Sequence, residues 1–148
     1  MQRYGPVLNN APKCKTRLSA IHGTGLFAGT RIEAGEPFMS LEDGEIIPVT
    51  SFHYDPEGLA ASEWNAISEH ELLVRQRRTL YYFINHDLRP NALVDIQSRQ
   101  VVASVAIDAD QEITLDYMRE PLPKRYLQTH GASYLFWSER GMRYDSFH

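Results

Sequence analysis

An apolar run, residues 79–84, ends in two polar residues, Asn85 and His86. Both side chains carry hydrogen-bond donors and acceptors that must be satisfied if they are buried. Such a corner is either a polar network that fixes the fold or a contact to a ligand. Taken alone, the pair favours a structural turn with a satisfied histidine, because single motifs are weak hypotheses. Its interpretation therefore depends on the motifs that accompany it.

Two further motifs lie before and after this pair. Gly23 and Gly25 form a Gly-x-Gly turn. Their missing Cβ atoms would let the backbone approach a ligand, although a plain β-turn is the commoner meaning. Tyr117 ends the run 112–117, and its phenol could line a ligand site or close a strand in the core. The three motifs together indicate a site better than any one of them.

The rest of the chain must position these residues, and most of it is typical of short β-strands separated by turns. The runs at 92–96 and 100–106 are typical of a hairpin. Strands are expected at residues 17–21, 26–28, 37–41, 45–49, 92–96, 100–106 and 112–117, with turns at 22–25, 33–36, 43–44, 97–99 and 107–111.

Two helices are also expected. Ser68 and Glu71 form a capping-box pattern ahead of three apolar residues, which predicts a helix over residues 69–78. The basic end of this segment would complement the helix dipole. A second, short helix is predicted over residues 124–129.

Length and composition indicate one globular domain. The chain has 148 residues, of which 43% are apolar and 23% charged, which is typical of a soluble protein. No run approaches the ~18 apolar residues that span a bilayer. The first twenty residues lack a hydrophobic signal core. We therefore expect a cytoplasmic protein without a membrane partner.

Neither a metal nor a nucleic acid is an expected ligand. Cys14 is the single cysteine, and the six histidines lack the spacing of a zinc site. The net charge of −4 argues against a nucleic-acid binder, whose affinity usually rests on clustered lysines and arginines that neutralise phosphates. Between Arg31 and Glu71, ten acidic residues stand against one arginine. This stretch is either a solvated face or an acidic rim that attracts a basic partner.

In their order, these motifs resemble those of the SET-domain family of protein lysine methyltransferases. The resemblance covers roughly residues 17–117, about two-thirds of the chain. Several pieces in this order argue against coincidence. They are Gly23-Thr24-Gly25-Leu26-Phe27-Ala28, the turn at 32–36, Asp43-Gly44-Glu45-Ile46, Phe83-Ile84-Asn85-His86 with Pro90-Asn91, and the run 112–117.

The resemblance implies a mostly β fold of several short curved sheets, with a small helical insertion around residues 55–80. It also implies a pseudo-knotted C-terminal strand, which passes beneath a loop so that the Asn-His and Asp-Tyr motifs become neighbours. Three segments are expected: an extended arm at 1–16, a SET domain at 17–118, and a closing segment at 119–148 that packs on the same domain.

The implied function is methyl transfer from S-adenosylmethionine to a lysine side chain of a protein or peptide substrate. The cofactor carries its methyl group on a positive sulfonium, and the lysine amine must be uncharged to act as nucleophile. Desolvation beside another cation lowers the pKa of an amine and favours that form. No histidine or carboxylate of these motifs must serve as base, which suits a mechanism of positioning and desolvation.

The resemblance also assigns roles to residues. Tyr117 would be catalytic, with its hydroxyl orienting the amine near the methyl group. Asn85 would bind the amino-acid portion of the cofactor, and His86 would contact adenine through its backbone while its side chain packs into the fold. The implied cofactor-binding set is His22, Gly23, Thr24, Gly25, Leu26, Tyr82, Asn85, His86, Phe136 and Trp137, and the implied substrate channel is Glu42, Tyr117 and Tyr134.

The sequence departs from the family pattern at several positions. Asp87-Leu88 follows the Asn-His pair in place of serine or cysteine, and Glu42 replaces an aromatic residue expected at the lysine channel. Glu42 could instead attract the substrate ammonium during encounter. Asp110 replaces a turn glycine, and aspartate tolerates the left-handed conformation.

The tail lacks the cysteines with which many family members close the site through zinc. Tyr134, Phe136 and Trp137 could form an apolar lid there, or could be ordinary core residues. These departures keep open a second interpretation, a catalytically weak SET-like module that binds a peptide. A stand-alone acidic interaction protein would explain the charge but not the order of the motifs.

Overall fold

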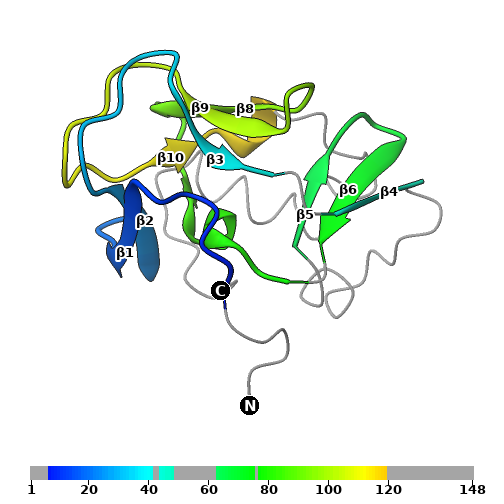
Figure 1. The fold of residues 1–148 in the computed structure, drawn as a ribbon, viewed down its shortest axis with the longest axis horizontal. Coiled ribbons are helices and arrows are strands. Elements are labelled where there is room, and N and C mark those ends of the chain that lie inside the picture. The colour runs from blue at the N-terminus through cyan, green and yellow to red at the C-terminus, as the bar shows by residue number, and fades with distance from the viewer. Residues whose placement is uncertain (1–6, 42–43, 49–62, 76, 120–148) are drawn as a thin grey trace.

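Short strands dominate the computed structural model, which describes residues 7–41, 44–48, 63–75 and 77–119 (Figure 1). The prediction of a mostly β fold of several short sheets is confirmed. Within these ranges no helix is long and apolar enough to cross a bilayer. The elements are β1 (Cys14–Leu18), β2 (Thr24–Ala28), β3 (Pro37–Ser40), β4 (Glu45–Pro48), β5 (Glu63–Ala66), β6 (Glu71–Arg75), the 3-10 turn η2 (Leu80–Phe83), β7 (Asn85–His86), β8 (Ala92–Asp95), β9 (Gln100–Ala103), β10 (Thr114–Leu115) and the 3-10 turn η3 (Tyr117–Arg119).

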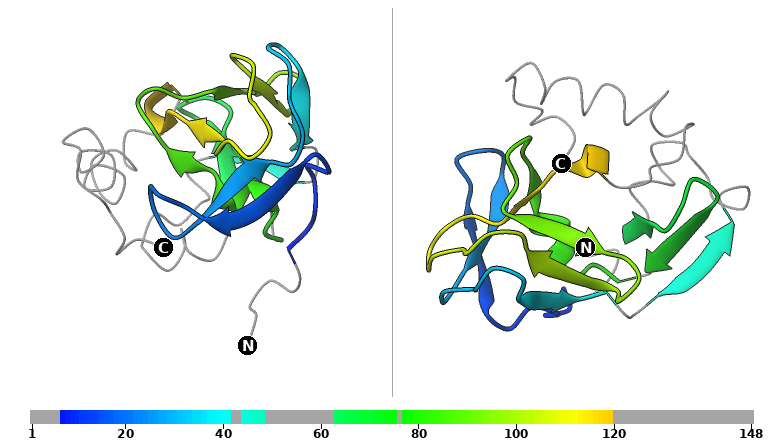
Figure 2. Two further views of the ribbon diagram at one scale, coloured as in Figure 1. Left: turned by 90° about the vertical axis from the view of Figure 1, so that its left-hand side faces the viewer. Right: turned by 90° about the horizontal axis from the view of Figure 1, so that it is seen from above.

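The described strands form four small sheets. β1 pairs with β2 and β7 with β10, while the two three-stranded sheets have the orders β3-β9-β8 and β4-β6-β5. Figure 1 places the β1–β2 hairpin and the β4-β6-β5 sheet at opposite ends, and the view from above in Figure 2 agrees. The strands that carry the site motifs, β7 and β10, lie between these ends.

Apolar side chains from several of these sheets share one core. Full burial of one leucine or isoleucine contributes about 1.5–3 kcal/mol. Ile84 and Ile113, which are 1% and 0% exposed, directly precede β7 and β10. The core therefore anchors the chain where it enters both strands of the site. Other large core residues are Leu26, Ile32, Leu41, Leu73, Val101 and Ile107.

The turns predicted at 33–36, 97–99 and 107–111 are confirmed, whereas the turn predicted at 22–25 lies earlier, because β2 already begins at Thr24. The amide of Glu36 donates to the carbonyl of Glu33 at 3.0 Å, and Gly35 between them has a φ of 81°. Asp110 adopts the left-handed conformation, with a φ of 68°, as predicted for a residue in the place of a glycine. The hairpin predicted from 92–96 and 100–106 is confirmed as β8 paired with β9.

The helix predicted over residues 69–78 is wrong, because β6 occupies this segment as the central strand between β4 and β5. Ser68 closes the turn that joins β5 to β6, and its hydroxyl accepts a hydrogen bond from the amide of His70 at 3.1 Å. A serine that bonds an amide two residues ahead suits a turn as well as a helix cap. The capping-box pattern therefore marks a hairpin turn.

The predicted helical insertion around residues 55–80 is corrected in the same way. Its described part contains β5, β6 and the start of η2. Residues 55–62 lie outside the described residues, as does the helix predicted over 124–129.

The arm predicted at residues 1–16 is packed in its described part, so that prediction is wrong there. β1 begins at Cys14, within the expected arm, and pairs with β2. The Asn10 side chain donates to the carbonyl of Ser40 at 2.7 Å and accepts from the amide of Leu80 at 3.1 Å. This segment therefore braces η2, the turn that leads into β7.

A buried ion pair ties the β5–β6 hairpin to η2. Arg75 Nε donates to Glu63 at 2.7 Å, and the two side chains are 2% and 4% exposed. Arg75 Nη2 also donates to Asn65 Oδ1 at 2.6 Å. The Glu63 carboxylate accepts from the amide and hydroxyl of Thr79, the N-cap of η2, at 2.9 and 2.7 Å. Because buried charges need partners, this network fixes where η2 begins.

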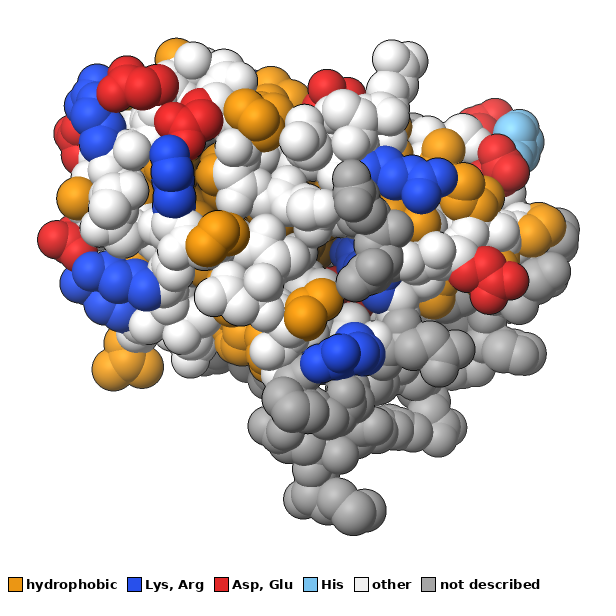
Figure 3. All heavy atoms as spheres, viewed as in Figure 1, with side chains coloured by type: hydrophobic (Ala, Val, Ile, Leu, Met, Phe, Trp, Pro, Cys, Tyr) orange, Lys and Arg blue, Asp and Glu red, His pale blue; other side chains and the backbone are white. Residues whose placement is uncertain are grey.

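Cations from elsewhere in the chain neutralise part of the acidic stretch. Lys13 pairs with Glu36 and holds the pKa of that carboxyl below its usual value. Acidic and basic side chains are interleaved along the edge near β1 and β2 in Figure 3. The described part of the stretch therefore favours a mixed, solvated face over an acidic rim. The described ion pairs of this surface are Lys13–Glu36, Lys15–Asp110, Arg17–Asp110, Arg31–Glu33 and Arg31–Asp108.

Candidate active site

Two strands from distant parts of the sequence, β7 and β10, lie side by side and run parallel. Asn85 pairs with Thr114, and His86 with Leu115. The amide of Asp87 extends this pairing by donating to the carbonyl of Leu115 at 2.9 Å. The prediction that the Asn-His and Asp-Tyr motifs become neighbours is confirmed. The passage of the last strand beneath a loop stays a prediction.

Asn91, from the Pro-Asn turn, holds the segment that includes β10. Its Nδ2 donates to the carbonyl of Glu112 at 2.8 Å, and its Oδ1 accepts from the amide of Thr114 at 2.9 Å. An asparagine can satisfy a backbone donor and a backbone acceptor at once, as a neighbouring strand would. The turn after the Asn-His corner therefore holds the strand that leads to Tyr117.

His86 lies in the interior and supports the segment that carries Tyr117. Its side chain is 0% exposed, and Nδ1 accepts the backbone amide of Tyr117 at 2.9 Å. A ring nitrogen that accepts a hydrogen bond carries no proton, so the imidazole is neutral with its proton on Nε2. The prediction that this side chain packs into the fold is confirmed. Contact between its backbone and adenine stays a prediction.

Tyr117 begins η3, two residues after β10. Its ring centre lies 4.9 Å from that of His86, at an angle of 43°. Its hydroxyl donates to the carbonyl of Ile84, the residue before the Asn-His corner. This bond directs the phenol proton toward the backbone and leaves oxygen lone pairs that can accept. The half-buried Tyr117 side chain is therefore held at both its amide and its hydroxyl.

The Asn85 side chain is the centre of a polar network beneath the Gly-x-Gly turn. Its Nδ2 lies 2.9 Å from Glu112 Oε2, 3.0 Å from the carbonyl oxygen of His22 and 3.1 Å from Ser19 Oγ. Among the described residues nothing donates to its Oδ1. Asn85 is only 3% exposed. Its amide therefore connects three segments that are far apart in sequence.

Ser19 links the Gly-x-Gly turn to the carboxylate of Glu112. Its hydroxyl lies 2.8 Å from both carboxylate oxygens. The same oxygen accepts from the amides of Ile21 and His22 at 2.9 and 3.2 Å. Glu112 thus gains two neutral donors, Ser19 and Asn85, and forms no ion pair with any residue in the described part of the chain.

The two glycines are required for different reasons. A Cβ on Gly25 would lie 2.4 Å from Glu112 Oε2 and 3.0 Å from Ser19 Cβ, so this position must lack a side chain for the network to form. Gly23 has a φ of 48°, and no atom of the described residues lies within 4 Å of the position of a Cβ. Gly25 is therefore selected by close packing, and Gly23 by its backbone conformation.

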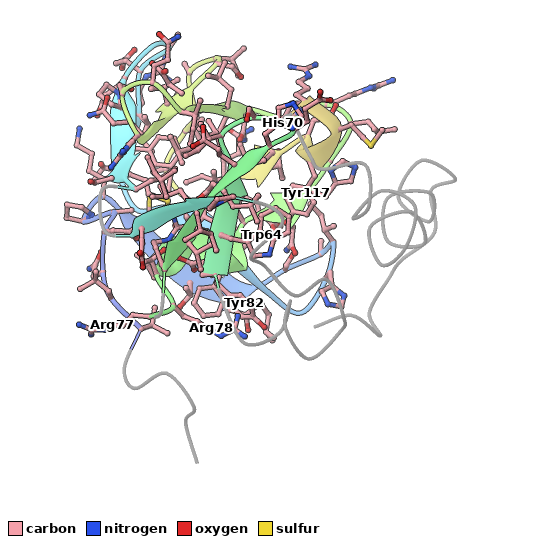
Figure 4. The ribbon with its side chains drawn as sticks, turned by 90° about the vertical axis from the view of Figure 1, so that its right-hand side faces the viewer. Trp64, His70, Arg77, Arg78, Tyr82 and Tyr117 are labelled. Carbon is pink, nitrogen blue, oxygen red and sulfur yellow. The ribbon has the colours of Figure 1, made fainter. Side chains whose placement is uncertain are left out.

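The other predicted site residues are placed in different ways. His22 is buried, and Thr24 is exposed. Leu26 is a core residue with 0% exposure, and its carbonyl accepts from the amide of Ile113. The guanidinium of Arg78 lies over the ring of Tyr82, with Cζ 3.9 Å from the ring centre, and both residues are labelled in Figure 4. Glu42, Tyr134, Phe136 and Trp137 lie outside the described residues, as does the closing segment beyond Arg119.

A cavity of about 260 Å³ opens beside the segment that leads to Tyr117. Its volume is below the roughly 300 Å³ at which small-molecule sites begin. The cavity therefore suits a single side chain better than a cofactor. It is lined by Ala66, Ala92, Leu93, Val94, Ile96, Leu115, Asp116 and Arg119.

Reasoning from the sequence missed Ser19 and Glu112 as site residues. Glu112 belongs to a motif that was recognised, but neither residue has a local pattern that indicates their contact.

No group of three or more histidine, cysteine, aspartate or glutamate side chains within the described ranges could hold a metal ion.

Comparison with curated proteins finds no match. The family model described as SET domain matches residues 23–118, about two-thirds of the chain. The matched residues include Gly25, the Asn85–Glu112 pair and the His86–Tyr117 pair described above. The chain belongs to the SET-domain family, whose members are generally protein lysine methyltransferases.

Proposed function

We propose that this protein methylates a lysine side chain in a protein or peptide, with S-adenosylmethionine as the methyl donor. The parallel pairing of β7 with β10 is the observation that carries the proposal. It joins the Asn-His corner to the segment that bears Tyr117. The Asn85 network then joins this corner to the Gly-x-Gly turn.

The polar atoms around Asn85 fit the amino-acid portion of such a cofactor, which carries an ammonium group. Asn85 Oδ1 is an acceptor that no described residue uses, and Glu112 supplies a negative charge 2.9 Å behind the amide nitrogen. No described residue occupies the position of the missing Cβ of Gly23. When bound, S-adenosylmethionine would supply a methyl group on a cationic sulfur.

Tyr117 suits the role of orienting the lysine amine. Because its hydroxyl proton is directed to the carbonyl of Ile84, the oxygen can accept an N–H from an incoming amine. This contact would fix the direction of the nitrogen lone pair without removing a proton. Positioning of this kind, together with exclusion of water, is sufficient for transfer to an uncharged amine.

The test begins with calorimetric titration of the full chain with S-adenosylmethionine. Tritiated cofactor is then incubated with the protein and a cell lysate, and acid hydrolysis identifies the labelled amino acid. We expect binding and radioactive methyl-lysine, with Tyr117→Phe as the matched inactive control. Failure to bind the cofactor overturns the proposal. Binding without transfer favours the alternative, a catalytically weak SET-like module that binds a peptide.

A further inference from the structure

We infer that Glu112 is a positioning residue of the cofactor site: with Ser19, it fixes the Asn85 amide so that only an acceptor oxygen is offered to the ligand. This inference rests on the proposed function. It assigns to Glu112 and Ser19 the selection of a ligand with a cationic amino-acid portion.

The first argument is the number of hydrogen atoms on the Asn85 amide. Nδ2 carries two, and three acceptors surround it: Glu112 Oε2, the carbonyl of His22 and Ser19 Oγ. Both hydrogens are therefore engaged within the protein. The atom of this amide that remains for a ligand is Oδ1, which can only accept.

The second argument is the alternative orientation of the amide. Rotation by 180° would place Oδ1 against the Glu112 carboxylate and the carbonyl of His22. Acceptor would then face acceptor, and the buried Nδ2 would lose its partners. Ser19 cannot reverse this preference, because its hydroxyl hydrogen is directed to Glu112. The carboxylate therefore determines which atom of Asn85 the ligand meets.

The third argument is charge. Glu112 is half-buried and has no cationic partner in the described structure. A partly desolvated carboxylate without a counter-ion favours a cation nearby. The ammonium group of an amino acid can donate a hydrogen bond to Asn85 Oδ1, and its positive charge can also compensate the Glu112 carboxylate.

Ser19 joins the Gly-x-Gly turn to this arrangement. It lies outside the matched range of 23–118. Its hydroxyl oxygen is held in place by the amides of Ile21 and His22. The turn that bears Gly23 and Gly25 is thus fastened to the same carboxylate that orients Asn85.

The experiment compares two ligands that share the adenosine and thioether groups. S-adenosylhomocysteine has the amino-acid portion, and 5′-methylthioadenosine lacks it. Glu112→Gln keeps the size of the side chain but removes its charge and one acceptor oxygen. We expect the Kd of this variant for S-adenosylhomocysteine to rise at least about tenfold, as loss of a hydrogen bond to a charged group implies. The Kd for 5′-methylthioadenosine should stay within about twofold.

Glu33→Gln is the matched control, because Glu33 is an exposed carboxylate paired with Arg31 in another turn. It should change neither Kd. Ser19→Ala is a second variant for the case in which Glu112→Gln fails to fold. It keeps the charge of Glu112 but removes the hydroxyl that donates to this carboxylate and accepts from the amides of Ile21 and His22. We expect a loss of about threefold for S-adenosylhomocysteine alone.

The outcomes separate this inference from the proposed function. If the unmodified protein binds neither ligand, both are overturned. If it binds them and the Glu112 and Ser19 variants weaken both ligands equally, or neither, only the positioning role is overturned. A loss confined to S-adenosylhomocysteine supports it, because a merely structural role would not distinguish the two ligands.

Discussion

The backbone amide of Tyr117 donates to Nδ1 of His86 over 2.9 Å, and the two rings lie 4.9 Å apart. The histidine of the Asn-His corner therefore supports the tyrosine proposed to orient the substrate. Because Nδ1 accepts, the support depends on a neutral imidazole. The two motifs thus act as one structural unit although 31 positions separate them in the sequence.

His86→Ala should destabilise the fold. The side chain is 0% exposed, so its removal leaves a cavity as well as an unpaired amide at Tyr117. We expect the free energy of unfolding to fall by about 2–5 kcal/mol. Urea denaturation followed by circular dichroism measures this change. An unaltered denaturation midpoint would contradict the structural role of the ring.

Tyr117→Phe should separate activity from stability. The change removes the hydroxyl that donates to the carbonyl of Ile84, which lowers the free energy of unfolding by about 0.5–1.5 kcal/mol. It leaves intact the hydrogen bond from the backbone amide of Tyr117 to His86. Methyl transfer should fall roughly hundredfold, because the amine is no longer oriented. Tritium transfer, with cofactor binding by calorimetry as the control, measures the effect. Undiminished turnover would remove Tyr117 from the catalytic role.

The sequence predicted most described strands where the signal is local, but not all their limits. β1 (Cys14–Leu18) begins three residues before the strand expected at 17–21, and β10 spans only Thr114–Leu115 of the run expected at 112–117. The β8–β9 hairpin follows from residue types at adjacent positions, whereas the left-handed conformation of Asp110 was expected because it stands in the place of the family's turn glycine. The helix over 69–78 failed because Ser68 bonds a nearby amide in a turn much as it would in a helix cap. β6 is a strand because it pairs with β4 on one side and β5 on the other, and no local sequence pattern indicates this pairing.

The order of the motifs predicted some residues of the candidate site but not all of them. Asn85, His86 and Tyr117 came from the resemblance, and the structure brings them together. Ser19 and Glu112 could not be paired from the sequence, since 93 positions separate them and each residue type is common on surfaces. Their contact depends on how the Gly-x-Gly turn lies against the strand before Tyr117.

The buried pair of Glu63 and Arg75 should be needed for stability. Arg75→Met leaves the carboxylate buried without its cation, and we expect a loss of about 3–5 kcal/mol. Replacing both residues with methionine should restore part of this loss, because no buried charge remains unpaired. Arg31→Met, at an exposed pair, is the control and should leave the urea midpoint unchanged. Equal midpoints for Arg75→Met and the unmodified protein would contradict the prediction.

Cys14 should react slowly with alkylating reagents. Burial raises the pKa of its thiol to about 11, so little thiolate is present near neutral pH. The iodoacetamide rate of the folded protein should still rise with pH at pH 10, whereas that of the urea-unfolded chain should level off above its ordinary pKa of about 8.5. A plateau near pH 9 in the folded protein would contradict this pKa.

The same shift sets a pH dependence of stability. Between the unfolded pKa and the folded value of about 11, the unfolded chain binds fewer protons than the folded chain. The contribution of Cys14 to stability therefore decreases as the pH rises through this interval. Cys14→Ala should remove that part of the decrease in urea denaturation measured from pH 8 to pH 10.

Gly25→Ala should act through Glu112. The new Cβ would lie 2.4 Å from Glu112 Oε2, so the carboxylate must move and its bonds to Ser19 and Asn85 must weaken. We expect a loss of about 1–3 kcal/mol in the free energy of unfolding, together with weaker cofactor binding.

A double-mutant cycle tests that cause. In a protein with Glu112→Ala the carboxylate is absent, so adding Gly25→Ala should cost less than it does in the unmodified protein, with a coupling energy above about 0.5 kcal/mol. Gly23→Ala is the contrasting variant, because its strain comes from a φ of 48° and not from a contact. Its cost should be the same with and without Glu112. Coupling for Gly23→Ala equal to that for Gly25→Ala would mean that close packing against Glu112 does not explain the second glycine.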